Sequence, residues 1–272
     1  MALLAVPVVT LAALGLWQLQ RYWVRWFRGV LSAGMTAYRK GDYEGQLREA
    51  ERLKNWMPSS HLLFRGMALY ALGRFKEAEE SLRQSLPMQK NPQQRANCEA
   101  ILGMVLREQQ RFEEAMACFE SAMRVKARSG DINREVANTL LRQGTQPGEA
   151  LRQARKAVEI DQAHRSATLS KVSPRLDAEN RDVSLGESLS TLAWAEAVNS
   201  GSASEVERLL QEAFGHGVEN HVPVMAKLHY NAGRAWAAIG KTEQSVTELN
   251  RAAEIDPRGN TGRLAKAAMS LA

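Results

Sequence analysis

Two histidines and a carboxylate lie close together as His216, Glu219 and His221, and these residue types bind zinc. A helical zinc site needs histidines four residues apart and a third ligand. Here the histidines are five residues apart and glycines surround them, which favours a polar loop without a metal. The sequence also contains no phosphate-binding loop, dinucleotide fingerprint or nucleophile elbow. It therefore predicts a protein that has no metal or cofactor and is not an enzyme.

The two cysteines, Cys98 and Cys118, are twenty positions apart and have no CxxC partner. A disulfide framework or a zinc site would need a different spacing. Both fall where small apolar residues are expected on two neighbouring helices. The sequence therefore predicts free, buried thiols in a reducing compartment.

The helices that position these residues belong to a repeated motif. Its clearest copy runs from Tyr230 to Pro257, with small Gly233 in the first helix, Gly240 in the turn and Leu249 in the second helix. This motif resembles the tetratricopeptide repeat (TPR), a two-helix hairpin. In other copies the turn falls at Gly41, Gly73 and Gln110, which are 32 and 37 residues apart, on either side of the ~34-residue TPR period.

The resemblance implies an all-α fold, because stacked TPR hairpins form a right-handed superhelical solenoid. We expect about six hairpins behind one N-terminal transmembrane helix. Repeats one to four occupy 29–161, and repeats five and six with a capping helix occupy 188–272. Between them, 162–187 lacks a clear apolar period, which leaves a linker and a degenerate helix both open.

The N-terminal segment 1–28 is predicted to be a transmembrane anchor. Residues 2–19 carry no charge and would span about 27 Å as a helix, close to the thickness of a bilayer core. Arginines and aromatic residues follow, as is typical of the headgroup boundary: Trp17, Arg21, Tyr22, Trp23, Arg25, Trp26, Phe27 and Arg28. A cleaved signal peptide is disfavoured, because no basic residue precedes the apolar run.

This layout is similar to that of bacterial membrane-anchored TPR proteins. The arginines follow the anchor, so the positive-inside rule predicts the N-terminus outside and the TPR domain in the cytoplasm, at the inner membrane. Away from this basic stretch, acidic and basic residues alternate, although the formal net charge is +6. No nucleic-acid partner is expected from that distribution.

In TPR arrays the first helix of each hairpin lines a concave groove. The residue after the small crossing position is Met35, Met67 or Met104 in three consecutive repeats. One turn later come the other predicted groove residues, Tyr38, Tyr70 and Arg107, with Arg39 beside the first. Methionines beside aromatic rings make an adaptable apolar surface, and the arginines add charge for acidic groups. Methionines that simply fill the space between helices are the alternative.

These residues predict a scaffold that binds partner proteins through the groove and recruits or assembles them at a membrane complex. The alternative is a stoichiometric accessory subunit of such a complex, in which the TPR domain is structural. Small residues in the anchor, among them Ala12, Ala13 and Gly15, would allow close packing against other transmembrane helices.

Overall fold

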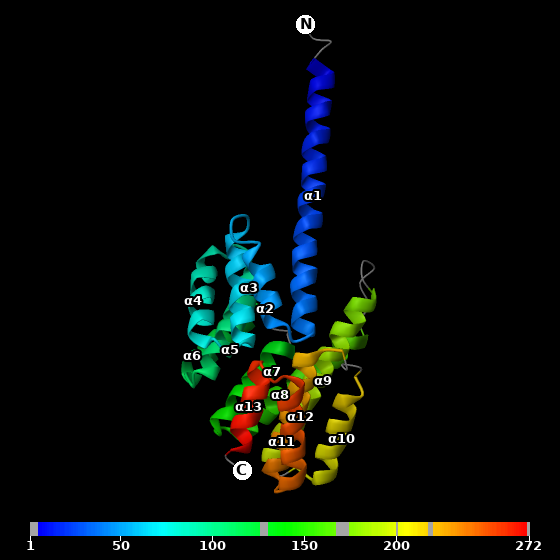
Figure 1. Cartoon of the computed structure of the whole chain (residues 1–272). Coiled ribbons are helices and arrows are strands. Elements are labelled where there is room, and N and C mark those ends of the chain that lie inside the picture. The colour runs from blue at the N-terminus through cyan, green and yellow to red at the C-terminus, as the bar shows by residue number, and fades with distance from the viewer. Residues whose placement is uncertain (1–4, 126–129, 167–173, 200, 217–219, 271–272) are drawn as a thin grey trace.

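The computed structural model describes residues 5–125, 130–166, 174–199, 201–216 and 220–270, without the side chains of 5–16 and 174–177. Across these ranges the chain forms thirteen α-helices and a short 3-10 helix, and no strand (Figure 1). The helices form six hairpins (α1–α2, α3–α4, α5–α6, α7–α8, α9–α10 and α11–α12), and α13 follows them. The predicted all-α class is confirmed.

The helix bounds are α1 (Ala5–Arg39), α2 (Tyr43–Glu51), α3 (Pro58–Ala71), α4 (Phe75–Ser85), α5 (Pro92–Glu108), α6 (Phe112–Val125), α7 (Gly130–Gln143), α8 (Pro147–Ser166), α9 (Pro174–Val198), α10 (Ala203–Phe214), α11 (Val222–Ala238), α12 (Thr242–Ile255) and α13 (Asn260–Met269), with the 3-10 helix η2 (Leu86–Met88) after α4. Of the segment 162–187, residues 162–166 end α8 and 174–187 form the first part of α9.

Glycines allow the two helices of several hairpins to cross closely. A Cβ atom at Gly66 would lie 2.6 Å from Leu82 Cγ, and one at Gly233 would lie 2.7 Å from Leu249 Cγ. At Gly103 the nearest atom would be Cε1 of Phe119, at 2.8 Å. These distances are too short for any side chain, so each glycine is required by helix packing.

Several hairpin turns share one backbone conformation. Gly41, Gly73 and Gln110 have φ values of 72°, 67° and 61°, in the left-handed region. Glycine adopts this region freely, whereas a residue with a Cβ atom is strained there by about 1–2 kcal/mol. Gln110 therefore occupies the same turn position as the two glycines, as the repeat spacing predicts.

The solenoid closes on itself, because the first hairpin touches the last (Figure 1). The hydroxyl of Tyr43 donates a hydrogen bond of 2.9 Å to Oδ1 of Asp256, just after α12. The ring of Tyr38 meets that of His221 edge-on at 5.7 Å. At the turn after α1, the Gly41 backbone lies so close to Val222 that a Cβ atom there would be 2.9 Å from Val222 Cγ1. The concave face predicted as a groove is therefore bounded by the first and the last hairpin as well.

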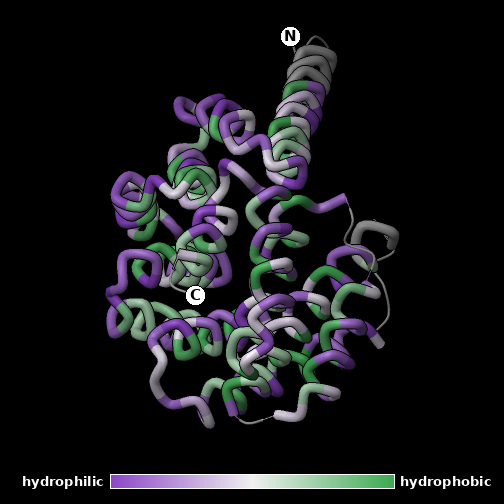
Figure 2. Tube along the Cα trace, turned by 60° about the horizontal axis from the view of Figure 1, so that its bottom comes forward, coloured by the Kyte–Doolittle hydropathy of each residue, from purple (hydrophilic) through white to green (hydrophobic). Residues whose placement is uncertain are grey.

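Helix α1 is the longest element, with 35 residues, and its N-terminal part projects beyond the helical body (Figures 1 and 2). Within the residues that the structure describes, no helix is both long enough and apolar enough to cross a membrane. The side chains of residues 2–16, which make up most of the predicted anchor, lie outside the described part of the chain.

Candidate functional site

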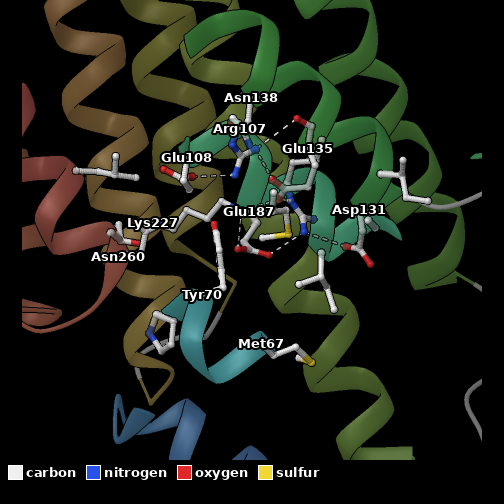
Figure 3. Close-up of a pocket in the computed structure, with 18 of the residues that line it drawn as sticks. Met67, Tyr70, Arg107, Glu108, Asp131, Glu135, Asn138, Glu187, Lys227 and Asn260 are labelled. Carbon is white, nitrogen blue, oxygen red and sulfur yellow. Dashed lines mark hydrogen bonds and ion pairs between the residues drawn. The ribbon is translucent and has the colours of Figure 1, made fainter. Parts of the chain in front are cut away.

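A cavity of about 540 Å³ lies inside the closed solenoid (Figure 3). Side chains from α3, α5, α7, α9, α11 and α13 line it, and Tyr38 reaches it from α1. Its volume is in the range of 300–1,000 Å³ that is typical of ligand sites. One side of this cavity is apolar and the other is charged.

We call the apolar side the apolar wall. It consists of three residues of α3 and three of α5: Leu63, Phe64, Met67, Ala100, Ile101 and Met104. All six side chains are half-buried. Tyr70 stands beside this wall and packs against Phe75, with ring centroids 6.2 Å apart. Flexible methionines and an aromatic ring can adapt to apolar groups of different shapes.

We call the charged side the ion network. It contains four cations and four carboxylates: Arg107, Arg134, Arg142, Lys227, Glu108, Asp131, Glu135 and Glu187. In Figure 3, Arg107, Glu135 and Glu187 gather opposite Met67, which projects from α3. Because the formal charges cancel, the network as a whole carries no net charge.

Glu135 lies at the centre of the network. Its carboxylate accepts hydrogen bonds from Arg107 Nη1 at 2.6 Å and from Lys227 Nζ at 2.9 Å. Burial opposes ionisation of Glu135, but the charges of Lys227, Arg107 and Arg134 outweigh burial and hold its pKa well below the ordinary glutamate value. Glu135 is therefore ionised, and α5, α7 and α11 are joined through its carboxylate.

Two further carboxylates extend the network. Glu187 Oε2 lies 3.0 Å from Arg134 Nη2, and its Oε1 lies 3.3 Å from Lys227 Nζ, so α9 is joined as well. Burial also opposes ionisation of Glu108, yet Arg142 and Arg107 keep its pKa below the usual range. Glu108 additionally accepts a hydrogen bond from Asn260 at the start of α13.

Some donors of this charged side have no partner. Nε of Arg107 and Nδ2 of Asn138 are buried and form no hydrogen bond within the described part of the chain. Both side chains are 4% exposed and line the cavity. A buried donor without an acceptor costs about 1–3 kcal/mol. An acceptor group that entered the cavity would therefore be stabilised at these atoms.

The structure brings five of the seven predicted groove residues to this cavity, namely Tyr38, Met67, Tyr70, Met104 and Arg107. Met35 lies outside it, 41% exposed beside a small recess between α1 and α2. Arg39 also lies outside, where Nη1 pairs with Glu179 at 3.3 Å and Nη2 with Asn180 at 3.2 Å. Whether these residues bind a partner stays a prediction.

Arg107, which was predicted to add charge for acidic groups of a partner, is not exposed as that prediction assumed. Its side chain is 4% exposed, and its guanidinium is matched by Glu135 and, at 3.4 Å, by Glu108. A buried guanidinium needs such carboxylates, because an unpaired charge away from water is strongly unfavourable. Arg107 therefore holds helices together.

The sequence reasoning missed most of the ion network. Part of the network could have been found by counting from the crossing glycine of each helix. In α3 and α5 the residue directly after that glycine, Met67 or Met104, faces the cavity. Three and six residues before Gly233, on the same face of α11, are Tyr230 and Lys227, and both line the cavity. Glu135 and Asn138 lie on α7, a helix without a crossing glycine in its middle, so no such reference position was available.

The candidate chemical groups noted in the sequence lie elsewhere. Burial raises the pKa of the Cys98 thiol to about 11, which keeps it protonated, and its sulfur donates to the carbonyl of Leu82 at 3.5 Å. His216 Nδ1 lies 3.4 Å from Asp182, whereas Glu219 falls outside the described residues. The described residues contain no cluster of His, Cys, Asp and Glu able to hold a metal.

Two family models, each described as the tetratricopeptide repeat, match the sequence at residues 58–128 and 102–165. These spans cover the hairpins from α3 to α8, which include the apolar wall and α7 of the ion network. Residues 58–165 are thus tetratricopeptide repeats, and the chain as a whole is an all-α solenoid of TPR-like hairpins.

Solved structures share this fold. A thermophilic TPR protein from Thermus thermophilus is 15% identical over 79% of this chain and 100% of its own, with a TM-score of 0.50. The Rap conjugation gene regulator of the plasmid pLS20, in complex with the Phr* peptide, is 14% identical over 88% of this chain and 75% of its own, with a TM-score of 0.51. At these identities the likeness concerns the fold alone. No curated protein matches the sequence significantly.

Proposed function

We propose that this protein is a non-enzymatic TPR scaffold that holds a segment of a partner protein in its central cavity. The observation that carries this proposal is the pairing of an apolar wall with unpartnered donors in one cavity of about 540 Å³. A segment of polypeptide can satisfy both, because it can place apolar side chains on the wall and its backbone carbonyls accept hydrogen bonds from the donors. The Rap regulator, which has this fold, was solved with a peptide.

The charge balance of the cavity narrows the chemistry of the bound segment. An additional buried charge would lack a counterion there, because four cations already face four carboxylates. An uncharged acceptor needs no counterion and would satisfy Arg107 Nε and Asn138 Nδ2. The preferred segment therefore places an apolar side chain on Met67 and Met104, and a carbonyl or side-chain amide at the donors.

We further propose that residues 2–19 anchor the scaffold in the inner membrane, with the N-terminus outside and the TPR domain in the cytoplasm. The support is the uncharged sequence of that segment and the arginines that follow it. Protease added to right-side-out vesicles should leave the TPR domain intact. Digestion of the TPR domain under those conditions would contradict this orientation.

Site-specific photo-crosslinking in cells tests the cavity. A crosslinking amino acid at position 104 reports on the apolar wall, and the same amino acid at position 35 is the matched control, because Met35 is exposed outside the cavity. We expect a defined partner adduct from position 104 and none from position 35. Equal adducts from both positions, or adducts only from position 35, would place the partner elsewhere.

A stoichiometric accessory subunit remains the second candidate. It is favoured by the exposed apolar side chains of α1, such as Leu19 and Val24, which are 60% and 43% exposed and suit a neighbouring helix. Gentle solubilisation separates the two candidates. A scaffold is recovered with sub-stoichiometric clients, whereas an accessory subunit is recovered at a fixed ratio with its complex.

A further inference from the structure

A group of exposed aromatic side chains surrounds α1 where the helix leaves the body. Trp17 is 49% exposed, Tyr22 69% and Trp23 36%, and Trp56 is 62% exposed. Trp56 does not belong to α1, because it lies in the turn between α2 and α3. We call these four residues the aromatic collar.

Trp56 is fixed against α1. Its ring meets that of Trp23 edge-on, with centroids 4.7 Å apart, and Trp23 in turn meets Trp26 at 5.4 Å. The turn is held by backbone hydrogen bonds of 3.1 and 2.8 Å from Trp56 and Met57 to the carbonyl of Leu53. Two segments distant in sequence therefore present aromatic rings at the same level of the molecule, where the α2–α3 connection lies near α1 (Figure 1).

The charge that α1 contributes around the collar has one sign. Residues 1–41 contain no aspartate or glutamate, whereas Arg21, Arg25 and Arg28 are all exposed. Nearby Lys54 is exposed as well. None of these four cations forms an ion pair among the residues that the structure describes, and the Arg21 guanidinium lies 4.5 Å from the centre of the Trp17 ring.

This combination fits one environment. Contiguous exposed apolar side chains are unusual on a soluble surface and mark a contact with another phase or molecule. Tryptophan, tyrosine and arginine are stabilised together at the headgroup level of a bilayer, where an apolar body meets a polar end. Each basic residue near an anionic lipid surface adds about 1 kcal/mol of attraction.

We infer that the aromatic collar is a membrane-interface footprint, in which α1 and the α2–α3 turn bind the headgroup region of an anionic bilayer together. The inference rests on the membrane anchoring proposed above and adds a second contact point. One helix alone would let the TPR body swing and turn about its axis. If Trp56 also binds at the interface, the TPR domain has one preferred orientation relative to the membrane.

The geometry has a consequence for the partner. Tyr38 lines the cavity and lies fifteen residues after Trp23 on the same helix, which corresponds to about 23 Å along α1. A cavity held at that distance from the headgroups suits a segment that emerges directly from the membrane. The footprint thus favours the juxtamembrane part of a membrane protein as the occupant.

The test uses the full chain reconstituted into vesicles of phosphatidylcholine, with and without phosphatidylglycerol. A polarity-sensitive dye is attached to Trp56→Cys, and to Val198→Cys as the control, because Val198 is exposed at the C-terminal end of α9. Both variants carry Cys118→Ser. Cys98 stays in place, since its buried thiol has a pKa of about 11 and does not react at neutral pH.

We expect a blue shift of the dye at position 56 that is larger with phosphatidylglycerol, and no shift at position 198. If the protein floats with the vesicles but the dye at position 56 does not shift, the anchor stands and the footprint is refuted. If the protein does not float, the anchor fails as well. A shift that depends on protein concentration and not on lipid would show that the collar binds protein instead.

Discussion

The two sides of the cavity are built from the first helices of different hairpins, and they differ in chemistry. On α3 and α5 the inner positions carry Met67 and Met104, which are apolar and half-buried. On α7, α9 and α11 they carry Glu135, Glu187 and Lys227, which bind one another across helices. We therefore propose that the apolar wall is available for a partner, whereas the ion network holds the solenoid closed. Changes on the two sides should therefore separate binding from stability.

The largest effect is expected for Glu135→Ala. It leaves buried Arg107 and Arg134 and half-buried Lys227 without their shared carboxylate, and breaking a buried pair typically costs about 3–5 kcal/mol. Urea unfolding followed by circular dichroism measures the loss. Glu77→Ala is the control, because Glu77 pairs with Arg74 on the surface and should change stability little. Equal effects of the two changes would contradict the role given to the network.

The next effect is the loss of folding stability at acidic pH. The pKa values of Glu135 and Glu108 are lower in the folded chain than in the unfolded chain, so below the ordinary glutamate pKa of about 4.3 the unfolded state binds more protons. Stability should be fully present above that pH and fall as the pH drops through the folded values. Asp161 and Asp256, whose pKa values burial raises, act in the opposite direction.

Unfolding measured as a function of pH tests this balance. The wild-type chain should lose stability steeply below about pH 4. Glu135→Gln should be less stable at neutral pH and should show a shallower loss in acid. An acid dependence that is unchanged by Glu135→Gln would mean that other carboxylates control it.

A smaller effect on stability is expected on the apolar wall. The double change of Met67 and Met104 to alanine should cost about 1–2 kcal/mol, below the sum for fully buried methionines, since each buried methionine is worth about 2–5 kcal/mol and these are half-buried. Partner crosslinking from position 101 should nevertheless fall sharply. If the double variant unfolds the chain, the two sides do not differ as proposed.

The smallest effect is expected for Met35→Ser. Met35 occupies the repeat position of Met67 and Met104, after Gly34, but it lies outside the cavity and is exposed. Exposed substitutions of this kind change stability by less than about 0.5 kcal/mol. Thermal melting and partner crosslinking from position 104 should both match the wild type. Loss of crosslinking would extend the binding surface onto α1.

The sequence predicts the hairpins well because their spacing follows from contacts within each repeat. A Cβ atom at Gly66, Gly103 or Gly233 would collide with the second helix of the same hairpin, so each position requires glycine. That requirement marks the position in the sequence. The turn at Gln110 is recognisable by its distance from Gly73. These features depend on neighbours within one period, so a local pattern contains them.

The candidate site depends on contacts that no local pattern contains. Every residue of α7 from Ile132 to Leu141 is buried, including Arg134 and Glu135, so this stretch has no exposed polar face that would mark its orientation. Whether Arg107 is exposed depends on Glu135, 28 residues later, and closure depends on Tyr43 meeting Asp256. Which distant residues meet depends on the curvature of the whole stack. The spacing within one repeat does not determine that curvature.

The contact between Tyr43 and Asp256 also has a consequence for biosynthesis. The two residues are 213 positions apart, so the hydrogen bond cannot form until nearly the whole chain has left the ribosome. Until then the hairpins of α3 and α5 can form, because their contacts are local, but the cavity that Met67 and Met104 line is incomplete. In a nascent chain in this state the apolar wall is a surface that a chaperone can bind.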